Sequence, residues 1–148
     1  MSGRNGHAIV LKAFTVRIIK RAEPMKGAVL DPSKPTEGCG GGGDSLDLWY
    51  GKKDLDANPP HWVPHAKSAE GNETGSLRFP YKVTASSPVQ LEIDVSTRHC
   101  DCTWVGRLDW SDGATSGTST LTDKGRPFRT TPTAGLPSYR WDGHTWRK

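Results

Sequence analysis

The chain has 148 residues, enough for one domain with a single core, although only 33% of them are hydrophobic. Its 20 basic and 16 acidic residues leave a net charge of +4. The two signs alternate, which is typical of a solvated surface and not of the basic stripe of a specific nucleic-acid-binding protein. No apolar run approaches the roughly 20 residues of a membrane span, so the sequence predicts no membrane helix.

The first residues show no secretory pattern, because the short apolar run "AIVL" is followed at once by Lys12. We therefore expect a cytoplasmic protein by default, or an extracytoplasmic one if this start lies downstream of the true one. Seventeen glycines and eleven prolines suit short strands joined by turns. We expect one β-rich domain over residues 1–148, with a loop-rich Gly/Pro segment at about 22–75.

The first predicted element is a long strand at His7–Arg21. Leu11, Phe14 and Ile18 also recur at helical spacing, so a helix is the competing prediction. The many β-branched residues favour the strand. Within the loop-rich segment, one short strand is expected at Ser45–Gly51.

Alternating apolar and polar residues predict three more strands. One is Ser76–Val83, which belongs at a sheet edge or a bulge because Pro80 has no amide hydrogen. Val89–Val95 has the clearest alternation in the chain. The apolar row resumes with the opposite parity at Cys100–Trp110, so we predict that these two segments form an antiparallel hairpin turning at Thr97-Arg98.

Turn residues divide the rest of the chain. Ser111–Gly113 and Asp123–Gly125 bracket a partner strand at Thr115–Leu121. Asp142-Gly143 predicts a two-residue hairpin between the last aromatic residues. Six to eight strands and no confident helix predict an all-β fold, an antiparallel β-sandwich with a barrel as the second choice.

Three cysteines cannot all pair within one monomer. Cys100 and Cys102 share a face with apolar residues, whereas His99 has the wrong parity, so we predict no metal at "HCDC" and no cofactor. Buried thiols and a disulfide remain open. If a disulfide forms, we expect Cys39 to pair with Cys100 or Cys102, with Cys100 as the first choice, because the glycine-rich loop around Cys39 has few other anchors.

"GDSL" (Gly43–Leu46) is similar to the nucleophile block of a serine-hydrolase family, with Ser45 as nucleophile and His144 as base. In that family the block follows a buried strand, and a terminal Asp-x-x-His completes the triad. Here small residues precede the block, and Asp142 lies one residue too close to His144. A small serine hydrolase is therefore kept as an alternative function.

Tryptophan is the residue type that suggests a ligand site. Trp104 and Trp110 lie on the inward row and are predicted to be core residues. The other four lie at turns and ends, where they could stack on sugars or partner side chains, or close the ends of the sandwich. At least Trp49 or Trp62 should be partly exposed. The candidate ligand-binding residues are Trp49, Trp62, Trp141 and Trp146.

Five segments taken together, "GCGGG", "LRFPYKVTASSP", "CDCTWVGRLDWSDG", "DKGRPFRTT" and "GLPSYRW", resemble an uncharacterised β-rich domain at the C-termini of actinobacterial proteins. Some of those proteins carry an N-terminal helix-turn-helix or a membrane segment. The resemblance covers the chain from about Val10 onward and implies an accessory role, with no catalytic residues.

The leading interpretation is a non-enzymatic binding or sensing module whose partner is a protein, a small molecule or a glycan. A weak nucleic-acid-binding accessory protein is the third alternative.

Overall fold

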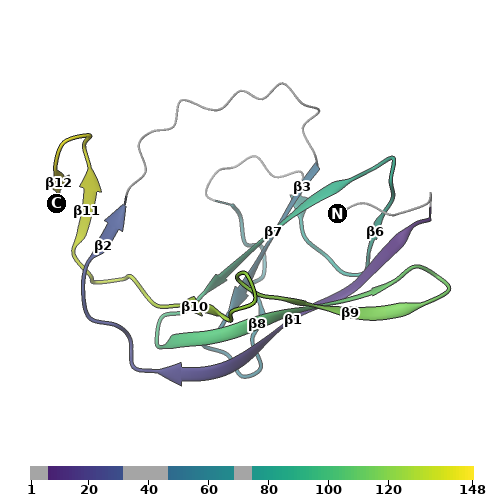
Figure 1. Cartoon of the computed structure of the whole chain (residues 1–148), viewed down its shortest axis with the longest axis horizontal. Helices are drawn as coiled ribbons and strands as arrows, with labels where there is room; N and C mark the ends of the chain where they lie inside the picture. The colour runs from purple at the N-terminus through teal and green to yellow at the C-terminus, as the bar shows by residue number, and fades with distance from the viewer. Residues whose placement is uncertain (1–6, 32–46, 69–74) are drawn as a thin grey trace.

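The computed structural model describes residues 7–31, 47–68 and 75–148. They form twelve strands and no helix, and so offer no helix that could span a membrane (Figure 1). The strands make a five-stranded, a four-stranded and a three-stranded sheet. None of these sheets closes on itself within the described ranges. The predicted all-β sandwich is therefore confirmed, and the barrel is not.

The five-stranded sheet is built on two long strands that pair antiparallel along their length, β1 and β8. β6 pairs with the other edge of β1, while β9 and β10 share the other edge of β8. Its strands are β1 (Ile9–Ala22), β6 (Tyr81–Val83), β8 (Asp101–Ser111), β9 (Ser116–Leu121) and β10 (Phe128–Thr130). The long strand predicted at His7–Arg21 is confirmed as β1.

The four-stranded sheet is centred on β3, and its strands are β3 (Asp47–Asp54), β4 (His61–Trp62), β5 (Gly75–Ser76) and β7 (Val89–Ser96). β7 runs parallel to β3 over its whole length. On the other edge of β3, β5 is parallel and β4 antiparallel. This sheet is therefore mixed, which the expected antiparallel sandwich did not include. It also places strands inside the segment that we predicted to be mostly loop.

The third sheet consists of β2 (Val29–Asp31), β11 (Ser138–Trp141) and β12 (Trp146–Arg147). β2 pairs parallel with β11, and β12 pairs antiparallel with it. In Figure 1 this small sheet stands at the left, away from the two larger sheets. It therefore adds little to the main core.

The main core lies between the two larger sheets, where apolar rows face each other. It consists of Leu11, Phe14, Val16, Leu55, Val83, Val89, Cys100, Cys102, Trp104 and Leu108. The prediction that Trp104 is buried is confirmed. Trp110 is only partly buried and packs at the margin of this cluster, so its assignment as a core residue was too strong.

The predicted hairpin between Val89–Val95 and Cys100–Trp110 is wrong. β7 pairs with β3, whereas β8 pairs with β1, β9 and β10. Residues 97–100 instead carry the chain from one sheet to the other (Figure 1). The alternation still identified the buried faces. Rows that face each other across a sandwich show the same alternation as rows side by side in one sheet, so the pattern could not identify the partner strand.

The single strand predicted at Ser76–Val83 is also wrong. Its ends form β5 and β6, which belong to different sheets, and the cis peptide bond Phe79-Pro80 lies between them. The proline thus sits outside any ladder, where its missing amide hydrogen is harmless.

The turn predictions fare better. The turns beginning at Asp112 and Asp142 both follow the pattern Asp-Gly-x-Thr, and in each the Asp N–H donates to the Thr carbonyl, at 3.0 and 3.1 Å. The central pair is therefore Gly-x, one residue beyond the predicted Asp142-Gly143. Lys124 and Gly125 both have positive φ, 50° and 86°, as a two-residue hairpin turn requires.

Candidate functional site

The four tryptophans proposed as ligand-binding residues do not converge on one site. Trp141 and Trp146 lie in the third sheet and pack on each other, with ring centroids 5.4 Å apart. Trp49 and Trp62 belong to the four-stranded sheet. Both are partly exposed, as predicted.

Three of the tryptophan rings cover strand glycines. A Cβ on Gly51 would lie 2.7 Å from Trp62, one on Gly75 would lie 2.8 Å from Trp49, and one on Gly117 would lie 2.6 Å from Trp110. Each ring therefore fills the space that the glycine leaves on its strand. These tryptophans have a packing role, which limits how far their rings can turn toward a ligand.

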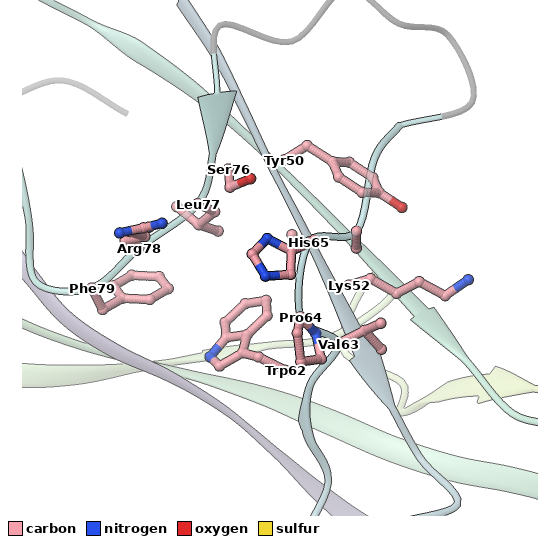
Figure 2. Close-up of a pocket in the computed structure, with 12 residues that line it drawn as sticks. Tyr50, Lys52, Trp62, Val63, Pro64, His65, Ser76, Leu77, Arg78 and Phe79 are labelled. Carbon is pink, nitrogen blue, oxygen red and sulfur yellow. The ribbon is translucent and has the colours of Figure 1, made fainter.

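A groove forms where β4 and β5 diverge from the same edge of β3, and we call it the β3 groove. Its volume is about 470 Å³. Backbone hydrogen bonds hold both walls to β3: Leu77 N–H donates to Tyr50 O at 2.6 Å, and Val63 N–H donates to Lys52 O at 2.8 Å. Figure 2 shows Arg78 and Phe79 on the β5 side, with Val63 and Pro64 on the β4 side.

The apolar part of the β3 groove is a pair of aromatic rings. Trp62 and Phe79 stack with centroids 6.0 Å apart. Behind them, Phe14 of the core also contacts Trp62. The Lys53 ammonium lies 4.4 Å from the Trp62 ring centroid, and burial lowers the pKa of Lys53. Trp62 is thus held in place from the core side.

The polar part of the groove carries positive charge. Lys52 and Arg78 both line it, together with His65, and its lining includes no carboxylate among the described residues. Lys52 has an ion-pair partner in Asp94, at 3.7 Å. Arg78 is exposed and has no ion-pair partner in the described part of the chain. The groove therefore combines a flat apolar surface with an available guanidinium.

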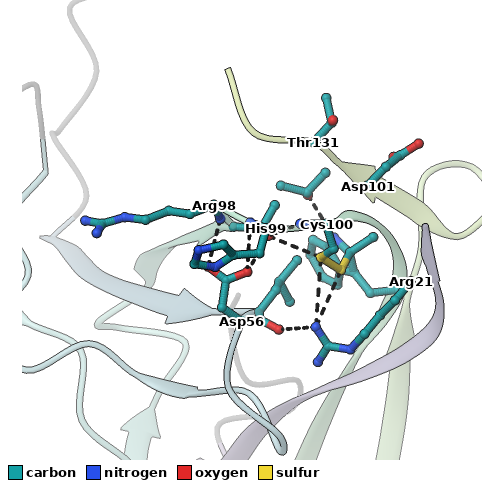
Figure 3. Close-up of a disulfide and its surroundings, with 12 residues drawn as sticks. Arg21, Asp56, Arg98, His99, Cys100, Asp101 and Thr131 are labelled. Carbon is teal, nitrogen blue, oxygen red and sulfur yellow. Dashed lines mark hydrogen bonds and ion pairs between the residues drawn. A yellow bond between two sulfur atoms is a disulfide. The ribbon is translucent and has the colours of Figure 1, made fainter. Parts of the chain in front are cut away.

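A second cluster surrounds a disulfide, and we call it the disulfide centre (Figure 3). The structure joins Cys100 to Cys102, with their Cα atoms 5.3 Å apart. Two residues of extended strand span about 6.6 Å, near the upper end of the usual range for a disulfide, and the shorter separation found here reflects a local bend. Cys100 supplies it, because it precedes β8 and lies just after the bend at residues 98–99.

This pairing corrects our expectation of a Cys39–Cys100 disulfide, since Cys100 is bonded to its near neighbour instead. Cys39 itself lies outside the described residues. The sequence predicts Cys100 and Cys102 as buried thiols or as disulfide partners of Cys39. A bond between these two cysteines is a further arrangement, and it forms where the chain bends before β8.

Asp56 holds the connection between β7 and β8 in place. Its carboxylate accepts hydrogen bonds from Thr97 Oγ1 at 2.7 Å and from the backbone N–H groups of Arg98 and His99 at 2.8 and 3.2 Å. His99 Nδ1 lies 3.3 Å from Asp56 Oδ2. Burial alone would raise the pKa of Asp56, but these hydrogen bonds outweigh it and hold the pKa below its ordinary value.

The metal and hydrolase predictions concern other residues. In the described ranges no group of three or more His, Cys, Asp or Glu side chains could hold a metal ion. Ser45 and the rest of Gly43–Leu46 lie outside those ranges. His144 is exposed, in the turn between β11 and β12.

Sequence reasoning found Trp62 but missed Phe79, Arg78 and Lys52. These residues come from strands that meet only in the folded chain, and no local pattern links them. The one available signal was Pro80, which marked a break beside Arg78 and Phe79.

No protein-family model, no curated protein and no solved structure matches this chain. Its functional assignment therefore depends on the geometry of its own sites.

Proposed function

We propose that this chain is a non-enzymatic β-sandwich binding module whose β3 groove holds an anionic ligand with a flat apolar face. The observation that supports this most directly is the stacked Trp62–Phe79 pair beside Arg78, which has no described acidic partner. An accessory role of this kind also agrees with the domain that the sequence resembles.

Each part of the groove matches one part of such a ligand. An aromatic ring stacks on the apolar face of a sugar or of another ring. A guanidinium donates paired hydrogen bonds to a carboxylate, which a neutral ligand cannot reproduce. The volume of about 470 Å³ lies within the range of small-molecule sites. Acidic sugars and aromatic carboxylates share this chemistry.

Binding titrations test the proposal. The probes are uronic-acid oligosaccharides, their neutral counterparts and aromatic carboxylates, each titrated by calorimetry. We expect at least one acidic probe to bind and its neutral counterpart to bind far more weakly. Arg78→Gln should raise Kd about tenfold or more, because a hydrogen bond to a charged group is lost.

Arg126→Gln is the matched control, because it removes the same charge from an exposed residue in the turn between β9 and β10. If Arg78→Gln and Arg126→Gln weaken probe binding equally, the effect comes from net charge alone, and the β3 groove is not the binding site. Absence of binding by every acidic probe would overturn the ligand class.

The nucleic-acid alternative is less well supported, because some of the basic side chains already have acidic partners. Five basic residues form ion pairs with aspartates: Lys52–Asp94, Arg107–Asp109, Arg129–Asp101, Arg140–Asp31 and Arg147–Asp142. A phosphate backbone would have to compete with each of these carboxylates. The hydrolase alternative predicts ester turnover that Ser45→Ala abolishes, and that assay tests it directly.

A further inference from the structure

The disulfide of the disulfide centre encloses very little chain. Cys100 and Cys102 are two residues apart, so the bond closes a loop with a single intervening residue. The stabilisation that a disulfide provides grows with the length of the loop that it closes. A cross-link this short therefore restricts the unfolded chain little, and its chemical surroundings are the more informative feature.

Arg21 places a positive charge beside both sulfur atoms. Its Nη1 lies 3.9 Å from Cys100 Sγ and 3.8 Å from Cys102 Sγ (Figure 3). The guanidinium is held there by the carbonyls of Leu55 and Ala57, at 2.7 and 3.3 Å. No carboxylate of the described residues forms an ion pair with Arg21. A fixed cation next to a sulfur favours the thiolate over the thiol.

The two sulfur positions differ in a second way. Cys102 is fully buried within β8, whereas Cys100 precedes the strand and is 5% exposed. Cys100 Sγ also lies 3.1 Å from Thr97 Oγ1, but that hydroxyl donates its hydrogen to Asp56 and so does not stabilise a thiolate on Cys100. Both cysteines are core residues, but Cys100 is the less deeply buried, so a small thiol would reach its sulfur more readily and leave Cys102 beside Arg21.

We propose that Cys100 and Cys102 form a thiol–disulfide exchange site for low-molecular-weight thiols, with Cys102 as the leaving group. The thiolate of the small thiol attacks Cys100 Sγ and forms a mixed disulfide there. The Cys100–Cys102 bond breaks, and its electron pair stays on Cys102 as a thiolate that Arg21 stabilises. A second small thiolate attacks the mixed disulfide, releases the oxidised small disulfide and leaves the Cys100 thiolate near Thr97. The pair gains two electrons, and two molecules of the small thiol lose them.

Redox titration of the folded protein tests this proposal. The full chain carries Cys39→Ser, so that only one pair can exchange, and is equilibrated in buffers of reduced and oxidised glutathione. Alkylation followed by mass spectrometry gives the reduced fraction, and circular dichroism reports the fold. We expect reversible reduction while the protein stays folded. Reduction only upon unfolding would show that the bond is structural and would overturn the proposal.

The charge variants test the role of Arg21. Arg21→Met should lower the equilibrium constant for reduction about tenfold, which is about 30 mV for a two-electron couple. Arg21→Lys should retain most of the effect. Arg17→Met, on the same strand, removes the same charge and should leave the constant unchanged. Equal shifts in Arg21→Met and Arg17→Met would overturn the role of Arg21.

Single cysteine variants test the direction of attack. In the Cys102→Ser protein, Cys100 should form a mixed disulfide with glutathione. In the Cys100→Ser protein, Cys102 should form far less, because it is fully buried. The reverse order would overturn the assignment of Cys102 as the leaving group.

Discussion

Trp104 is the largest side chain in the main core, and it also holds the edge strand β10 against β8. It is 8% exposed and stacks on Phe128 of β10, with ring centroids 4.6 Å apart. Its Nε1–H donates to Thr130 Oγ1 at 2.9 Å. One residue thus secures β10 to β8 through an apolar and a polar contact. Truncating the Trp104 side chain should therefore expose the neighbouring core residues to solvent.

We predict that Trp104→Ala lowers the free energy of unfolding by about 3–5 kcal/mol, as large aromatic truncations in cores do. Trp146→Ala is the matched control, because Trp146 lies exposed in the third sheet and should cost only about 0.5 kcal/mol. Urea denaturation of both variants gives the two values. A Trp104→Ala protein as stable as the control would contradict the assignment.

The carboxylate of Asp56 makes the stability of the fold depend on pH. Its folded-state pKa is below the ordinary value, so the unfolded chain binds the proton more readily. The stabilisation is therefore complete at neutral pH. It is lost as pH falls from about 4 through the folded pKa.

Asp56→Asn should cost about 1.5–3 kcal/mol at pH 7, because the charged acceptor for Thr97, Arg98 and His99 is lost. The difference from the unmodified protein should shrink at pH 3. Chemical denaturation at the two pH values checks this. An equal loss at both would mean that the charge of Asp56 contributes nothing.

At the scale of strands, pairs of glycine and tryptophan shape the surface of both larger sheets. Gly51 of β3 lies under Trp62 of β4, and Gly117 of β9 lies under Trp110 of β8. The first pair borders the β3 groove, whereas the second is in the other sheet. The same glycine-to-alanine substitution can therefore be made at both sites, and only Gly51 lies at the proposed ligand site.

We predict that Gly51→Ala displaces Trp62, because the new Cβ would lie 2.7 Å from its ring. Overpacking of this kind should cost about 1–3 kcal/mol and weaken binding of an acidic probe to the groove. Gly117→Ala should cost a similar amount by displacing Trp110 and leave probe binding unchanged. Thermal melts and calorimetry measure both effects. Unchanged binding in Gly51→Ala would argue against the β3 groove.

At the scale of the whole molecule, the three sheets should differ in local stability. β1 and β8 form a long central ladder over the core. The third sheet is short, and its large side chains Leu30 and Trp146 are exposed. Regions with few buried apolar contacts open locally, at a lower free energy than that of global unfolding.

Hydrogen exchange followed by mass spectrometry should therefore show slow exchange in β1 and β8 and fast exchange in β2, β11 and β12. Trp146→Ala should leave the slow group unchanged. Equal protection in the third sheet would mean that it belongs to the same cooperative unit as the core.

What the sequence by itself determined was local. The alternation in Val89–Val95 identified a strand and its buried face, and Asp112 and Asp142 marked turns, because side-chain direction and turn geometry depend on neighbouring residues. The long strand at His7–Arg21 followed from its β-branched residues for the same reason. The all-β class follows from these local signals together.

Only the tertiary structure decided which strands pair, how the cysteines bond and where the groove lies. β7 pairs with β3 because of contacts between segments about 40 residues apart, and alternation is the same for any partner. The Cys100–Cys102 bond forms just after the bend where the chain changes sheets. Trp62 and Arg78 line one groove because two strands diverge from β3, and no local sequence pattern predicts that these residues lie together.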